Sequence, residues 1–310
     1  RRCWGLASSH IAARHADCLE GLTPSGLRMR NPVINILARL SVGRKLLLIY
    51  LLDLTAVIFI SSILINEKFI AINFARDETR GNAYIGVVRE ALVDLALEGT
   101  RGAPQTGAND PAHQKLTRHI APLQEAERLF GAELGSAEMN ARFVQALEAV
   151  AGGSTEQARG ITEGIARGRD LVTRVGNQSK MILDPDLDSY YTMSLTMLRY
   201  PELLELVHST GLLLREEARG GKALGNEART RYLILEGRLD ATATGIQSDY
   251  GEAISAGGEP VKAALAPGEQ KLTATIERFR LAARQAVEDG ATTAGIAALQ
   301  EAQRALLLQL

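Results

Sequence analysis

Hydrophobic residues dominate one long run near the start of the chain. Residues 46–65 read LLLIYLLDLTAVIFISSILI, and Asp53 is the single charged residue among them. A helix of about twenty residues spans the ~30 Å hydrocarbon core of a bilayer. A buried core helix of a soluble protein is the alternative, but such a helix keeps a polar stripe over this length. The run therefore predicts a transmembrane helix at 46–65.

After this run, apolar residues recur three and four positions apart, which is the spacing of helices packed in a bundle. One such series is Ile85, Val88, Leu92 and Leu95, and another, in which Thr242 takes one position, is Tyr232, Leu235, Leu239, Thr242 and Ile246. Glycine-rich breaks separate helices, which are expected at 45–98, 111–150, 156–183, 185–216, 226–254 and 260–308. No alternation of apolar and polar residues predicts a strand. The sequence therefore predicts an all-α fold, a long antiparallel helical bundle or two stacked four-helix bundles, continuing from one transmembrane helix.

Basic residues flank the apolar run on its N-terminal side, whereas mixed charge follows it. The basic residues are Arg28, Arg30, Arg39, Arg44 and Lys45. The positive-inside rule therefore predicts a cytoplasmic segment at 29–45 and an exported domain at 66–310. In a Gram-negative cell this places the chain in the inner membrane with its bulk in the periplasm. Asp53 is either a polar contact across a dimer of such helices or a tolerated polar residue.

Residues 1–28 differ in character from the rest of the chain. They hold both cysteines and the single Trp, show no sustained period, and lack the apolar core of a secretory signal. Met29 opens a segment that has the character of a natural start. We interpret 1–28 as a translation start placed too far upstream or as a cytoplasmic tail.

Composition and motifs exclude several functions. Because 35 Lys and Arg balance 36 Asp and Glu, the chain lacks the cationic surplus of a nucleic-acid-binding protein. Cysteines confined to 1–28 exclude a disulfide framework and a cysteine-based zinc site in the main body. Asp184, Asp186 and Asp188 match the first positions of a calcium loop, but the required Gly and Glu are missing. We predict no catalytic residue, no cofactor and no metal site, and a membrane-bound enzyme is the weakest of the alternatives.

Two segments carry a family resemblance, VGRKLLLIYLLDLTAVIFISSILINEKFIAINFAR (42–76) and LDPDLDSYYTMSLTMLRYPELLE (183–205). They resemble the transmembrane and periplasmic helical-bundle sensor modules, of the four-helix-bundle or helical bimodular type, of bacterial signal transducers such as chemoreceptors and sensor histidine kinases. The resemblance implies a homodimeric sensory input whose second membrane helix leads to a cytoplasmic output domain. The chain ends at ALLLQL (305–310), before such a helix, so we expect it to be a fragment. Two alternatives stay open, the input of a diguanylate cyclase and a membrane-tethered helical interaction protein without enzymatic output.

The segment at 181–207 carries the candidate ligand residues. Tyrosines offer hydroxyls on apolar bodies, and a guanidinium can hold a carboxylate with two hydrogen bonds. The candidates for binding a small molecule, such as an organic anion, are Arg89, Tyr190, Tyr191 and Arg199. In the alternative interpretation the tyrosines pack as core or dimer contacts, and Arg199 pairs with an acid such as Glu202 or Glu205. Pro201 is expected to kink or break the helix.

Overall fold

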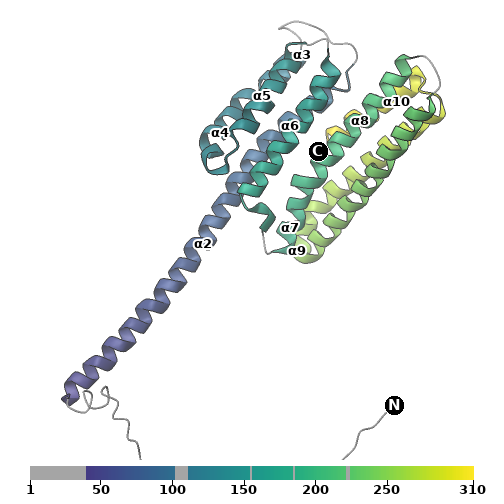
Figure 1. Cartoon of the computed structure of the whole chain (residues 1–310). Coiled ribbons are helices and arrows are strands. Elements are labelled where there is room, and N and C mark those ends of the chain that lie inside the picture. Colours follow the sequence, from purple (N-terminus) through teal and green to yellow (C-terminus); the bar gives the residue numbers. More distant parts are fainter. Residues whose placement is uncertain (1–39, 102–110, 154–155, 184–185, 221–223) are drawn as a thin grey trace, which may run out of the picture. The chain divides into compact units, whose positions relative to one another are not determined.

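The computed structural model describes residues 40–101, 111–153, 156–183, 186–220 and 224–310 (Figure 1). Every regular element in these ranges is a helix, and no strand occurs among them, which confirms the all-α prediction. The chain divides into two compact units, Arg1–Asn66 and Glu67–Leu310. The predictions for residues 1–28 and for the basic flank up to Arg39 lie outside the described residues, and so does Asp184.

The apolar run lies in α2 (Val42–Glu98), a helix of 57 residues. No proline interrupts this sequence, so the backbone hydrogen bonding can continue throughout. An 18-residue window of α2 has a mean hydropathy of 2.4, and none of that window is buried. By length and composition, α2 is the one candidate for a membrane span among the described residues.

The part of α2 that belongs to the second unit supplies core residues. Tyr84, Val88 and Leu95 are fully buried, and Leu92 is nearly so. These positions are three or four apart, as the sequence pattern predicted for a helix that presents one face to a bundle. The stretch of α2 from Gly81 to Glu98 is thus part of the helical bundle.

Four shorter helices follow along the chain, namely α3 (Pro111–Thr117), α4 (Ile120–Leu134), α5 (Ala137–Ala151) and α6 (Gln157–Gln178). The prediction of one helix at 111–150 is therefore wrong. Gly135 ends α4 in a left-handed conformation with φ 55°, and its N–H bonds to the carbonyl of Gly131. Glycine suits this position at the end of α4, because the left-handed conformation is costly for residues with a Cβ atom.

The next stretch contains four consecutive helical elements, η1 (Met181–Leu183), α7 (Leu187–Ser194), the π-helical turn η2 (Leu195–Arg199) and α8 (Tyr200–Arg219). Pro201 lies in the first turn of α8, directly after the π-helical turn. Proline has no N–H to donate to the preceding turn, and a widened turn accommodates the missing bond. The irregularity predicted at Pro201 therefore takes the form of this turn.

The element α9 (Asn226–Glu288) contains a break at Gly258, where φ is 67° and ψ is −157°. This confirms the break predicted at 255–260. The two halves of α9 run antiparallel, because Arg280 pairs with Asp240 at 2.7 Å and Arg284 pairs with Glu236 at 3.3 Å. The residue numbers of the paired side chains rise along one half of α9 and fall along the other, as antiparallel helices require.

A further turn separates α9 from α10 (Thr293–Leu307), so the prediction of one helix at 260–308 is wrong. Gly290 and Ala291 have φ values of 72° and 58°. Thr292 then caps α10, since its side-chain oxygen accepts a hydrogen bond from the N–H of Gly295 at 3.2 Å. The glycine and the threonine cap together end one helix and start the next.

The helices of the second unit form two groups around one connected hydrophobic core. In the first group α5 contacts α3, α4 and α6, and in the second group α9 contacts α7, α8 and α10 (Figure 1). The contact between α6 and α8 joins the groups. The second unit is thus a helical bundle, and its pockets lie where helices from different parts of the sequence meet.

Candidate functional site

Arg199, the first of the predicted ligand residues, forms an ion pair with a buried acid. Its Nε–H donates to Oδ2 of Asp249 at 2.9 Å, and the hydroxyl of Ser194 donates to the same oxygen at 2.7 Å. Asp249 lies on α9 and is only 5% exposed. An acid therefore does neutralise Arg199, but it differs from the expected Glu202 and Glu205, which pair with other arginines.

The other predicted residues lie on different elements. The rings of Tyr190 and Tyr191 on α7 meet edge to face, with centroids 5.3 Å apart and planes at 79°. Tyr190 is exposed and Arg89 is exposed on α2. Among the described residues, no hydrogen bond, ion pair or ring contact joins Arg89 to Tyr190, Tyr191 or Arg199. The use of these four residues in ligand binding stays a prediction.

The segment around α7 does line a pocket of about 340 Å³, together with α2, η1 and α9. Its lining residues are Glu78, Thr79, Asn82, Met181, Asp188, Ser189, Thr192, Met193, Thr196 and Val261. The hydroxyls of Thr79, Thr192 and Thr196 donate to backbone carbonyls four residues earlier, at 2.8, 2.8 and 3.2 Å. These hydroxyls therefore present acceptor lone pairs to the pocket, and the lining contains carboxylates but no cationic side chain. Such a lining disfavours an organic anion.

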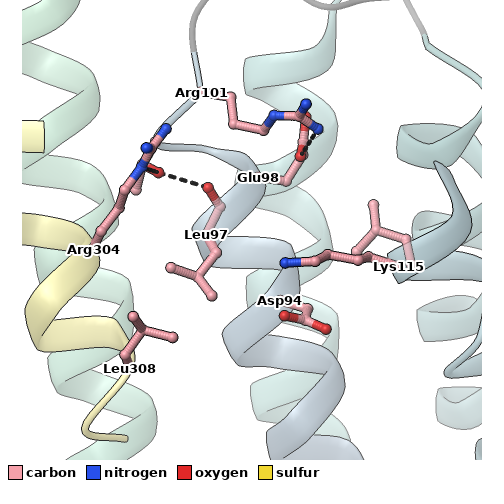
Figure 2. Close-up of a pocket in the computed structure, with 9 residues that line it drawn as sticks. Asp94, Leu97, Glu98, Arg101, Lys115, Arg304 and Leu308 are labelled. Carbon is pink, nitrogen blue, oxygen red and sulfur yellow. Dashed lines mark hydrogen bonds and ion pairs between the residues drawn. The ribbon is translucent and has the colours of Figure 1, made fainter. Parts of the chain in front are cut away.

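A second pocket, which encloses about 360 Å³, lies at the C-terminal end of α2 (Figure 2). We refer to it as the end pocket. Its lining residues are Asp94, Leu97, Glu98, Thr100, Arg101, Lys115, Leu116, Arg304 and Leu308. They come from the end of α2 and the residues just after it, from α3, and from α10 with the residue after it. Three of them are cationic, and this combination was not anticipated from the sequence.

The two carboxylates of the end pocket already have cationic or polar partners. Oδ2 of Asp94 lies 2.7 Å from Nη2 of Arg118 and 2.8 Å from Nε2 of His119. Glu98 forms an ion pair with Arg101 at 3.1 Å. The negative charges at this end of α2 are therefore compensated within the protein.

A buried polar network lies behind the end pocket. Arg215 of α8 is 7% exposed and donates to the carbonyl of Gly99 at 2.6 Å and to Oε1 of Gln303 at 2.8 Å. Gln303 in turn donates to the carbonyl of Val207 at 3.1 Å. Burial lowers the pKa of Arg215 to about 10, so the side chain is still cationic at neutral pH. The last carbonyls of a helix carry partial negative charge, and Arg215 satisfies one of them at the end of α2.

His208 lies beside this network in a site that disfavours its charged form. It is 1% exposed, and its Nε2 lies 3.1 Å from the hydroxyl of Thr162. Burial, together with the nearby positive charge of Arg215, lowers the pKa of His208 to about 4. The imidazole is therefore neutral at physiological pH, and it packs against the backbone at Gly99.

Within the described residues, no group of three or more His, Cys, Asp or Glu side chains is placed to hold a metal ion. No protein family, curated protein or solved structure matches the chain. The function must therefore be inferred from the chain's own features, chiefly the exposed apolar part of α2 and the two pockets described above.

Proposed function

We propose that this chain is the membrane-anchored extracytoplasmic sensory input of a bacterial signal transducer, such as a chemoreceptor or a sensor histidine kinase. One observation carries the proposal. A single helix, α2, contains an exposed apolar stretch long enough to cross a bilayer and also supplies buried residues such as Tyr84 and Leu92 to the bundle. Large exposed apolar surfaces are unusual on soluble proteins, and a bilayer would cover this one. A ligand that binds between the helices of the bundle can then act on the same helix that crosses the membrane.

The proposal places residues 46–65 across the inner membrane, the preceding residues in the cytoplasm and the bundle in the periplasm. Fusions of alkaline phosphatase and of a fluorescent protein test this topology. A phosphatase fused after residue 220 is expected to be active, and a fluorescent protein fused at residue 40 is expected to be bright. The opposite pattern, or a chain found entirely in the soluble fraction, would refute the membrane-anchored arrangement.

The proposed module is a homodimer built on the long antiparallel bundle. Three exposed apolar side chains on α9 support a protein contact there, since Leu233, Ile234 and Leu281 are 60%, 59% and 53% exposed. Light scattering of the purified chain in detergent measures its mass directly. The dimer is expected in the native chain and is expected to weaken in Leu233→Glu, whereas a monomeric native chain contradicts this part of the proposal.

The reading frame that follows Leu310 distinguishes the proposal from its alternatives. A second membrane helix followed by a kinase or methyl-accepting signalling domain is expected. A cyclase domain in that place would support the diguanylate cyclase alternative. A stop codon soon after Leu310 would instead favour a membrane-tethered interaction protein.

A further inference from the structure

We propose that the end pocket binds a small organic anion, held by Arg304 of α10 and Lys115 of α3. This inference rests on the proposed sensory function and assigns it a ligand class and a site. This site differs from the one predicted around Tyr190 and Arg199. The guanidinium of Arg199 already bonds to Asp249, and the pocket near α7 is lined mainly by hydrogen-bond acceptors.

The charges of the end pocket select for an anion. Three cations line it, and Arg101 among them pairs with Glu98. The Nε–H of Arg304 donates a hydrogen bond to the hydroxyl of Thr100 at 2.8 Å. Within the described ranges, neither Arg304 nor Lys115 forms an ion pair. Two terminal nitrogens of the guanidinium and the ammonium group of Lys115 are therefore left to hold an oxyanion.

Both cations line the same pocket. Figure 2 shows Arg304 and Lys115 reaching toward the last turns of α2 from opposite sides. Three leucines, Leu97, Leu116 and Leu308, provide apolar lining. A volume of about 360 Å³ lies at the lower end of the range of small-molecule sites. A carboxylate with a small apolar body therefore fits the chemistry and the size of the pocket better than a bare inorganic ion.

Such a ligand would add a link between helices that already meet at the end of α2. Gln300 of α10 donates to the carbonyl of Thr100 at 3.2 Å, and the Nε–H of Arg304 donates to the hydroxyl of the same residue. An anion between Arg304 and Lys115 would tie α3 to α10 across this turn. Binding would thus favour arrangements of the bundle in which α3, α10 and the end of α2 lie close together.

Calorimetric titration of the whole chain in detergent at low salt tests the assignment. The probes are succinate and benzoate, their neutral amides succinamide and benzamide, and inorganic phosphate. We expect at least one carboxylate to bind and its amide to bind about tenfold more weakly or not at all, because a hydrogen bond to a charged group is lost. Arg304→Gln and Lys115→Gln are each expected to weaken binding about tenfold, whereas Arg304→Lys is expected to retain part of it.

Arg128→Gln is the matched control, because Arg128 is an exposed arginine of the same unit that pairs with Glu125 outside the pocket. It is expected to leave affinity unchanged. The proposal is overturned if none of the carboxylates binds at concentrations up to about 10 mM. It is also overturned if phosphate alone binds, if the amides bind as well as the acids, or if both pocket variants bind like the native chain. None of these results alters the membrane topology, which the fusion experiment tests separately.

Discussion

Gly168 of α6 provides a quantitative test of how α2 packs in the bundle. A Cβ atom at this position would lie 2.5 Å from Cδ2 of Leu92, 2.9 Å from Cγ of Leu92 and 2.9 Å from Cε2 of Phe143. Leu92 and Phe143 are themselves buried in the core, so neither can easily move aside. Gly168→Ala is therefore expected to overpack the contact between α2, α5 and α6, at a cost of about 1–3 kcal/mol.

The substitution also has a favourable component, because alanine stabilises a helix interior by about 1 kcal/mol relative to glycine. Gly237→Ala on α9 isolates this component, since Gly237 is exposed and a Cβ there would meet no atom within 4 Å. The difference between the free energies of unfolding of the two variants therefore gives the packing cost alone. Gly168→Ala is thus expected to be less stable than Gly237→Ala by about 1–3 kcal/mol.

Urea unfolding of the whole chain in detergent, followed by far-UV circular dichroism, measures both free energies. Adding Leu92→Ala to Gly168→Ala opens space for the new methyl group, so the two substitutions should couple favourably by about 0.5–3 kcal/mol. Equal stabilities of Gly168→Ala and Gly237→Ala, together with no coupling to Leu92→Ala, would refute the described packing of α2.

Two further predictions concern buried polar groups. Because the pKa of His208 is lowered from 6.5 to about 4 in the folded chain, the unfolded chain binds the proton first as the pH falls. The free energy of unfolding should therefore drop by on the order of 3 kcal/mol between about pH 6.5 and 4, and urea titrations of His208→Gln should show a flatter profile. Asp249→Asn weakens the bond from Arg199 and should destabilise the chain by about 1–3 kcal/mol in the same assay. The exposed neighbour substitution Glu252→Gln should change stability by less than about 0.5 kcal/mol, and equal effects at both positions would contradict the role of the Asp249 ion pair.

Local chemistry made the helical class and some of the helix boundaries predictable from the sequence. The start expected for α2, at residue 45, lies close to the observed Val42, because a long apolar run without proline favours a continuous helix. The break near Gly258 was predictable for a related reason, since Gly-Gly followed by proline disfavours a continuous helix. The helix at 111–150 was predicted without its turns because the seam of apolar residues continues through Gly135, and a single glycine does not necessarily end a helix.

The amino-acid sequence by itself determined the all-α class, the exposed apolar run in α2 and the buried face that includes Ile85 and Leu92, because each of these depends on composition and spacing over a few helical turns. Only the tertiary structure decided which charged groups meet. It placed Asp249 beside Arg199, and it brought Lys115 and Arg304 to the end of α2 from positions far apart in the chain. Periodicity identifies the face of a helix that packs, but it carries no information about which helix lies against that face. For this reason the sequence predicted a helical bundle, while the location of the proposed anion site depended on how the helices pack.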